Sequence, residues 1–270
     1  MRSIAVASGK GGVGKTSVSV NLGLVLSKMG KRVIIVDADV IMANMGILLG
    51  IERAPISLHD VLIGEVDVKD AVYDGPAGLK YVPASLGMEK LASIDYPRLA
   101  QAVAELGENA DFVLVDCPSG LAIDAENALK SCKEVLLVLT PEPASLADAL
   151  KVKKAAERNN MGVAGVVYNM VIGDKSEIRG SDVEVLMGEK ILAEIPLDLN
   201  VRRAGAMQEP VVMKFPDTAF SKGMWEVARK LSGEAGDSSG FQSVKKGLLH
   251  RIIELANRPI NFVKKLLKKN

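Results

Sequence analysis

The chain has 270 residues, of which 48% are hydrophobic and 25% charged, a composition that excludes a disordered chain and fits a folded protein with one sizeable core. Its longest stretch without a charged residue, 159–173, is too short for a membrane-spanning helix. The first expected strand leaves no room for a signal peptide, so we expect a cytoplasmic protein. The two cysteines, Cys117 and Cys132, lack the spacing of a metal site and are expected to be buried thiols.

A glycine-rich loop follows the first expected strand, residues 4–7. Gly9 to Thr16 read Gly-Lys-Gly-Gly-Val-Gly-Lys-Thr, which matches the phosphate-binding pattern G-x-x-x-x-G-K-[ST]. Residues 16–27 carry apolar side chains at helical spacing, so the loop lies between a strand and a helix. The alternative, an ordinary glycine-rich turn, does not require this context. We therefore predict that the backbone N–H groups of the loop bind nucleotide phosphates at the positive end of the helix.

Individual residues of this loop have distinct expected roles. Lys15 is expected to neutralise the β- and γ-phosphates, and the Thr16 hydroxyl to hold Mg²⁺. A second lysine, Lys10, comes directly after the first glycine. The residues expected to contact the nucleotide in the loop are Gly11, Gly12, Val13, Gly14, Lys15, Thr16 and Ser17.

Short apolar runs rich in Val, Ile and Leu recur after the loop, as is typical of parallel strands buried on both faces. They lie at residues 33–36, 112–115, 135–139, 163–167 and 191–195, and helix-length segments such as 98–106 and 145–158 separate them. This alternation predicts an α/β P-loop NTPase fold, a mostly parallel sheet with helices on both faces, over residues 1–231. Residues 232–243, rich in Gly and Ser, are expected to form a flexible linker.

Two of the expected strands end in acidic segments, Asp37-Ala38-Asp39 and Asp116-Cys117-Pro118-Ser119-Gly120. Either segment alone could cap a turn or a helix. Because both follow a phosphate loop, the pair favours catalysis, in which one carboxylate holds a Mg²⁺ water and another orients the attacking water.

The loop with Lys10 and the two acidic segments together resemble the deviant Walker A ATPases of the MinD/ParA type, and within them the septum-positioning MinD group. The resemblance covers residues 1–231. It implies ATP and Mg²⁺ as cofactors, slow and partner-stimulated ATP hydrolysis, and a homodimer that forms when ATP binds.

The resemblance also implies roles for single residues. Lys10 reaches the phosphates of the second copy, Asp39 positions the attacking water, and Asp148 interacts with Lys10. Glu142 contacts the nucleotide of the opposing copy. The implied catalytic residues are Lys10, Lys15 and Asp39; the implied metal site is Thr16, Asp37 and Asp116; and adenine recognition is implied for Asn169, Pro196 and Asp198.

Residues 244–270 differ in charge from the rest of the chain. They contain eight Lys/Arg and one Glu, a net charge of +7, whereas the remaining 26 Lys/Arg and 32 Asp/Glu give −6. Apolar residues at helical spacing lie between the basic ones, with Pro259 expected to kink the helix. A helix docked on the domain and a nucleic-acid-binding arm are alternatives, but an amphipathic segment on an anionic membrane explains both the charge and the apolar stripe.

The sequence therefore predicts an ATPase at the inner face of the cell membrane that positions the division machinery or another structure with an unidentified regulatory or cargo protein. A ParA-like partition ATPase that binds DNA and a P-loop metal-cluster assembly factor are the alternatives. We expect nucleic acid not to be a partner, and we hypothesise that the tail binds membrane even in the monomer. The two histidines, His59 and His250, lie in no catalytic constellation and are interpreted as incidental.

Overall fold

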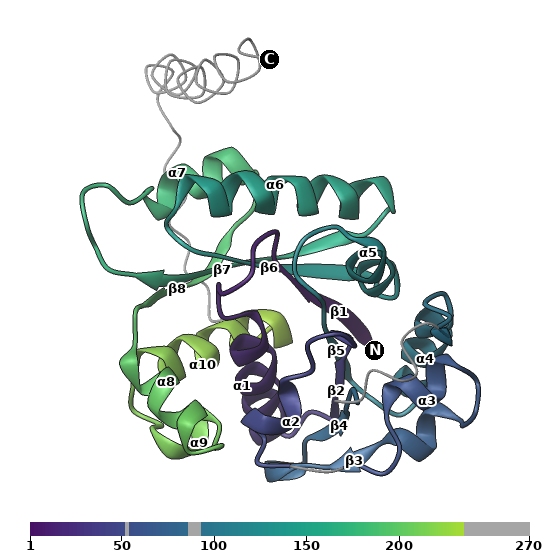
Figure 1. Cartoon of the computed structure of the whole chain (residues 1–270). Helices are drawn as coiled ribbons and strands as arrows, with labels where there is room; N and C mark the ends of the chain where they lie inside the picture. Colours follow the sequence, from purple (N-terminus) through teal and green to yellow (C-terminus); the bar gives the residue numbers. More distant parts are fainter. Residues whose placement is uncertain (52–53, 86–92, 235–270) are drawn as a thin grey trace. The chain divides into compact units, whose positions relative to one another are not determined.

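Helices cover both faces of an eight-stranded sheet in the computed structural model of the chain (Figure 1). The structure describes residues 1–51, 54–85 and 93–234, which belong to one compact unit, Met1–Glu234. The strand order is β3-β4-β2-β5-β1-β6-β7-β8, and every pairing except that of β3 with β4 is parallel. This confirms the predicted mostly parallel sheet. The tail expected at residues 244–270, and all but the first three residues of the expected linker, lie outside the described residues.

All six of the expected strands form. The strands are β1 (Arg2–Ala7), β2 (Val33–Asp37), β3 (Tyr73–Asp74), β4 (Lys80–Val82), β5 (Phe112–Asp116), β6 (Glu134–Leu139), β7 (Gly162–Val171) and β8 (Ile191–Pro196). The central strand, β1, lies between β5 and β6, and the carboxyl ends of β1, β2 and β5 meet at one edge of the sheet. Asp37 and Asp116 are direct partners in the β2–β5 register, so the topology itself brings these two acidic strand ends together.

The expected helices also form, with bounds that differ by one or two residues. The α-helices are α1 (Lys15–Lys28), α2 (Met45–Leu48), α3 (Leu58–Leu62), α4 (Arg98–Gly107), α5 (Ile123–Lys130), α6 (Pro143–Arg158), α7 (Gly180–Met187), α8 (Leu199–Ala206), α9 (Val211–Lys214) and α10 (Ala219–Ser232); two short 3₁₀ helices are η1 (Val68–Ala71) and η2 (Pro76–Gly78). Among the described residues, no helix has both the length and the apolar character that crossing a bilayer requires.

Two hydrophobic cores fill the spaces on either side of the sheet. Along β1, Ile4 and Val6 face a core shared with α1 and α10, whereas Ala5 and Ala7 face the core under α3 to α7. Each large aliphatic side chain buried in this way contributes about 1.5–3 kcal/mol. Helix α1, which carries the phosphate loop at its start, is packed between β strands and α10 and is buried on most sides. The loop is therefore attached to the most rigid part of the fold.

Candidate active site

The loop between β1 and α1 approaches its neighbours so closely that two of its glycines, Gly9 and Gly14, have no room for a side chain. A Cβ on Gly9 would lie 2.4–2.6 Å from atoms of Asp148 on α6, and a Cβ on Gly14 would lie 2.6 Å from the Asn169 amide nitrogen. Gly12 and Gly14 also have positive φ angles, 80° and 89°, which favour glycine. The loop therefore fits against α6 and β7 with its backbone N–H groups available to phosphate oxygens.

Asn169, which lies on β7, stabilises this loop with a side-chain hydrogen bond. Its side-chain amide is buried and donates a 2.8 Å hydrogen bond to the Val13 carbonyl oxygen. The sequence implied an adenine contact for Asn169 and carried no signal for this bond, because it joins residues 156 positions apart. Contact with the base stays a prediction for its remaining amide oxygen.

A buried ion pair lies directly behind the loop. The Lys15 Nζ is 3.8 Å from Oδ1 of Asp116, which also accepts a 2.8 Å hydrogen bond from the Ser19 hydroxyl. Burial raises the pKa of the Asp116 carboxyl, and the Lys15 charge and the hydroxyls of Thr16 and Ser19 oppose this rise without cancelling it. Within the described part of the chain, the buried Oδ2 of Asp116 has no hydrogen-bond partner. Ser19 was not expected in the site.

Asp37 organises the loop that follows β2. Its Oδ1 accepts the Asp39 N–H and its Oδ2 accepts the Met45 N–H, both at 3.3 Å, so one carboxylate fastens both ends of the loop. The Met42 N–H in turn donates a 3.0 Å hydrogen bond to Oδ1 of Asp39. Burial, followed by repulsion from Asp116, raises the pKa of Asp37 well above its ordinary value.

These residues fit a magnesium–nucleotide group. A buried carboxylate oxygen without a partner on Asp116, a second buried carboxylate on Asp37 and the nearby Thr16 hydroxyl are the hard oxygen donors that Mg²⁺ prefers. A bound cation would also relieve the repulsion between the two carboxylates. The residues predicted as metal ligands are thus brought together, and Lys15 lies beside them.

Lys10 lies at the outer side of the loop with its side chain partly exposed. Its Nζ donates a 2.6 Å hydrogen bond to Oε2 of Glu142, at the start of α6. Asp148, the residue implied as the partner of Lys10, instead pairs with Lys151 at 2.8 Å in this single chain. Both members of the Lys10–Glu142 pair are about half exposed, so the pair is weak, on the order of 0–1 kcal/mol, and readily exchanged.

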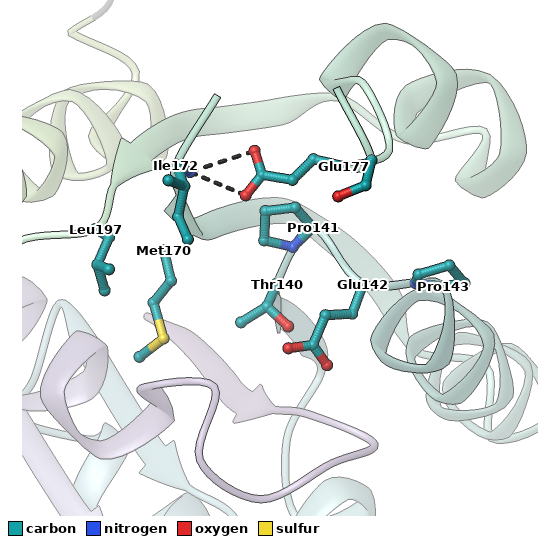
Figure 2. A pocket seen from close by; sticks show the side chains of 9 residues that line it. Thr140, Pro141, Glu142, Pro143, Met170, Ile172, Glu177 and Leu197 are labelled. Carbon is teal, nitrogen blue, oxygen red and sulfur yellow. Dashed lines mark hydrogen bonds between the residues drawn. The ribbon is translucent and has the colours of Figure 1, made fainter. Parts of the chain in front are cut away.

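A cavity of about 500 Å³ opens next to the loop, between the ends of β6, β7 and β8 (Figure 2). Met170 and Leu197 form one side of it, and Thr140, Pro141 and Glu142 another. Its wall is closed by Glu177, whose carboxylate accepts the Ile172 N–H at 3.0 and 3.2 Å. This cavity, which the sequence did not predict, is well placed for the nucleoside part of a ligand whose phosphates lie on the loop.

Pro196 and Asp198 flank Leu197 in the sequence, and of these three residues Leu197 lines the cavity. Asp198 caps α8: its Oδ1 accepts the Asn200 N–H at 2.9 Å, and its Oδ2 accepts the Phe220 N–H at 3.3 Å. Burial alone would raise the pKa of Asp198, but these hydrogen bonds outweigh it and lower the pKa. The structure therefore shows a capping role for Asp198, and its contact with a base stays a prediction.

His59, interpreted above as incidental, is fully buried and hydrogen-bonded to the loop after β2. Its Nε2 lies 3.0 Å from the carbonyl oxygen of Val40, the residue after Asp39, and its Nδ1 lies 3.0 Å from the N–H of Ser85. The sequence carried no signal for these contacts, because a histidine far from the motifs does not indicate which backbone atoms it will contact.

Known proteins of similar sequence span nearly the whole chain. Residues 1–232 match the ParA family model, described as NUBPL iron-transfer P-loop NTPase. An uncharacterized ATP-binding protein of Methanocaldococcus jannaschii is 35% identical over 230 residues, which are 85% of this chain and 87% of that protein. The septum site-determining protein MinD of Synechocystis is 30% identical over 262 residues, 93% of this chain and 97% of its own length.

Solved structures agree with the sequence comparison. MinD from Pyrococcus horikoshii, complexed with Mg-ADP, superposes with a TM-score of 0.83 at 32% identity and covers 87% of this chain and 97% of its own. MinD in a MinC:MinD cell division complex from Aquifex aeolicus superposes with a TM-score of 0.78 at 27% identity, over 90% of this chain and all of its own.

Proposed function

The chain belongs to the ParA family of P-loop NTPases, and from this premise we propose that it is a Mg²⁺-dependent ATPase that dimerises on binding ATP and positions another structure from the membrane. One observation carries the proposal: Lys15, Asp116 and Asp37 converge beneath the phosphate loop, while Lys10 lies exposed at its rim. The first three residues suit nucleotide hydrolysis, and Lys10 is available to a second copy. ATP and Mg²⁺ fit this site, and a relative of the same fold is complexed with Mg-ADP.

Each residue of the site has a separate role in the transfer of the γ-phosphoryl group to water. In this reaction the bond from the γ-phosphorus to the bridging oxygen breaks, the water oxygen bonds to phosphorus, and ADP and phosphate are released. Thr16 and Asp116, with Asp37 nearby, would hold Mg²⁺, which would supply positive charge to the phosphate oxygens. Lys15 adds a second positive charge, and Asp39 accepts a hydrogen bond from the attacking water. The water proton ends on the phosphate product.

The dimer would form across the surface that surrounds Lys10. Exposed apolar residues lie in the loop after β2 and in the segment after β5: Ile41, Met42, Leu121 and Ile123. Four large apolar side chains near one charged rim favour burial in an interface. In the dimer, Lys10 would leave Glu142 for the partner's nucleotide, and Glu142 would contact that nucleotide as well. The cost of opening the exposed pair is small.

Attachment to the membrane is assigned to residues 244–270, which lie outside the described residues. Burial contributes about 0.8 kcal/mol per CH₂, and anionic lipid adds about 1 kcal/mol per basic residue near the surface. A dimer presents two tails, and such linkage raises avidity on the order of 10²–10⁴. The protein would then be peripheral on the inner face of the cell membrane and recruit a regulatory or cargo protein there. A solved complex of a relative with MinC supports a partner protein.

The tail is long enough that we further propose attachment in the monomer as well, with ATP controlling the engagement of partners. Sedimentation of the Lys15→Ala variant with anionic vesicles tests this point. Retention of the variant on the vesicles supports it, and its loss from the pellet would refute it.

A role in iron transfer, which the family description names, needs thiolate ligands. Burial raises the pKa of the Cys117 thiol well above its ordinary value and that of Cys132 to about 12. Neither thiol is therefore poised to bind a metal as thiolate at neutral pH.

A ParA-like DNA-binding role is separated from membrane binding by comparing binding to duplex DNA with binding to vesicles over a range of salt concentrations.

The proposed ATPase is tested by phosphate release from ATP with and without Mg²⁺. We expect slow Mg²⁺-dependent turnover by the wild type, loss of nucleotide binding in Lys15→Ala, and nucleotide binding without turnover in Asp39→Ala. Equal turnover by Asp39→Ala and the wild type would remove Asp39 from the mechanism. A pull-down that compares Asp39→Ala loaded with ATP against Lys15→Ala would identify the partner.

A further inference from the structure

His59 joins three parts of the chain at a fully buried point. It lies in α3, and its ring nitrogens face the loop after β2 at Val40 and the segment after β4 at Ser85, each at 3.0 Å. Val40 comes directly after Asp39, whose carboxylate is assigned to the attacking water. The imidazole therefore contacts the backbone of the residue next to the hydrolytic side chain.

The two contacts fix the tautomer of the ring. The Ser85 backbone N–H can only donate, so the Nδ1 of His59 must be the unprotonated acceptor. The proton of the neutral ring is then on Nε2, which donates it to the Val40 carbonyl oxygen. The geometry thus requires a neutral imidazole with the proton on Nε2.

The attachment of α3 itself does not depend on His59. The Leu58 N–H donates a 2.7 Å hydrogen bond to the Pro83 carbonyl oxygen. A capping box fastens the first turn, in which both the N–H and the hydroxyl of Ser57 donate to Oδ2 of Asp60, at 2.7 and 2.8 Å. Because the Leu58–Pro83 bond already joins α3 to the segment after β4 and the capping box closes its first turn, the bond to Val40 is available to hold the loop after β2.

Among the described residues, most other bonds to that loop come from within it, and one comes from β5, where the Asp116 carbonyl oxygen accepts the Ala38 N–H at 3.0 Å. Asp37 fastens its ends at Asp39 and Met45, and Asp39 accepts the Met42 N–H. The bond from His59 is a contact from a separate element to the Val40 carbonyl, in the peptide that joins Val40 to Ile41. It restrains the rotation of that peptide and hence the direction of the Asp39 side chain.

We propose that His59 is a positioning residue for ATP hydrolysis: its Nε2–H holds the Val40 carbonyl so that the Asp39 carboxylate faces the attacking water. This inference rests on the proposed ATPase function and concerns the chemical step, because His59 lies in an element separate from the phosphate loop. Its loss should therefore lower kcat while nucleotide affinity stays nearly constant.

Two isosteric substitutions of His59 test the roles of its two ring nitrogens separately. The Asn amide oxygen can replace Nδ1 as acceptor for Ser85 but leaves Val40 without a donor, whereas the longer Gln can place an amide N–H near the position of Nε2. For His59→Asn we expect about a tenfold fall in kcat with the Kd for ADP changed less than about twofold. For His59→Gln we expect kcat within about threefold of the wild type.

Tyr73→Phe is the matched control for simple loosening of this region. The Tyr73 hydroxyl donates to the Ile56 carbonyl oxygen at 3.0 Å and accepts the Ile56 N–H at 2.9 Å, next to α3 but away from Val40. We expect Tyr73→Phe to lower the unfolding temperature about as much as His59→Asn and to leave kcat unchanged. An equal fall in kcat in Tyr73→Phe, or equal kcat in His59→Asn and His59→Gln, would overturn the proposal.

The ring can also be examined in the folded wild-type site. The chain has two histidines, so His250→Asn leaves His59 as the single imidazole. Long-range ¹H–¹⁵N spectra should show the neutral tautomer protonated on Nε2 at pH 7.5, and a charged ring or a proton on Nδ1 would refute the proposal even if no His59 variant folds. If the wild type fails to hydrolyse ATP, the proposed function falls; if it hydrolyses ATP and the ring is in the wrong tautomer, this inference alone falls.

Discussion

Two carboxylates lie close together in the buried part of the site, and their repulsion lowers the stability of the folded chain. Because burial and Asp116 raise the pKa of Asp37 above its ordinary value of 3.8, the folded chain binds this proton more tightly than the unfolded chain. Stability therefore falls as the pH rises from about 4 through the raised pKa. Functional sites commonly keep such unfavourable charges because their chemistry requires them.

Asp37→Asn imitates the protonated carboxyl and leaves the Lys15–Asp116 pair intact. Without nucleotide at pH 8, we expect its unfolding temperature to exceed that of the wild type by roughly 3 °C, about 1 kcal/mol. The gain should shrink toward pH 4, and Mg²⁺-dependent hydrolysis should fall about tenfold or more. Thermal unfolding across this pH range, with phosphate release at pH 8, measures both. A variant less stable than the wild type at pH 8 would contradict the assignment.

Gly9 controls how closely the phosphate loop approaches α6. Since a Cβ there would lie 2.4–2.6 Å from Asp148, we expect Gly9→Ala to displace the loop and lower nucleotide affinity about tenfold or more, as measured by fluorescent ADP binding. Gly11→Ala is the control for folding, because its Cβ meets nothing closer than the Ser119 hydroxyl at 4.0 Å. If Gly9→Ala unfolds no earlier than Gly11→Ala and binds ADP normally, the contact does not shape the loop.

The residues that could be predicted from the sequence are those that lie in contiguous motifs. The phosphate loop and the Asp37-x-Asp39 segment can be recognised in the sequence because phosphate and metal chemistry fix the spacing of their residues. Ser19 and His59 act through bonds to residues 97 and 19 positions away, which no local pattern encodes. Asn169 was predicted in the site, but its bond to Val13 was not, for the same reason.

At the scale of elements, long buried strands were predictable and short peripheral ones were not. β1, β5 and β6 are buried on both faces and give continuous apolar runs. β3 and β4 have two and three residues, too few to show any periodicity. The loop after β2 is held by bonds from Asp37, which is local in sequence, and from His59, and the His59 bond follows from the fold and not from the loop's own sequence.

Lys153 on α6 makes polar contacts with the end of α7, beside the apolar packing of the two helices. The Lys153 Nζ lies 2.9 Å from Glu189 and 3.4 Å from Glu157, and it donates to the Met187 carbonyl oxygen at the end of α7. We expect Lys153→Met to cost about 1–2 kcal/mol in chemical denaturation without changing ADP binding. Lys151→Met, which breaks an exposed pair two residues away on α6, should cost less than about 0.5 kcal/mol. Equal costs for the two variants would show that the Lys153 contacts stabilise the fold no more than an exposed ion pair does.

For the whole molecule, the division of charge between an acidic body and a basic tail predicts how it meets a membrane. With a net charge of +7 in residues 244–270, binding to vesicles that contain anionic lipid should weaken sharply as salt rises from 0.1 to 0.5 M, about tenfold or more. Vesicles of neutral lipid should bind weakly throughout. Sedimentation with both kinds of vesicle measures this, and equal binding to neutral lipid would assign attachment to apolar burial alone.

The central claim is that ATP binding brings two copies of the chain together and that Lys10 of each copy completes the nucleotide site of the other. The most direct measurement is the mass in solution of Asp39→Ala, by light scattering with Mg-ATP or with Mg-ADP, beside the same variant carrying Lys10→Ala. We predict a dimer for Asp39→Ala with ATP and a monomer with ADP. The double variant should bind ATP with similar affinity and remain monomeric. A monomer of Asp39→Ala at saturating ATP, or a dimer that forms equally well without Lys10, would contradict the account.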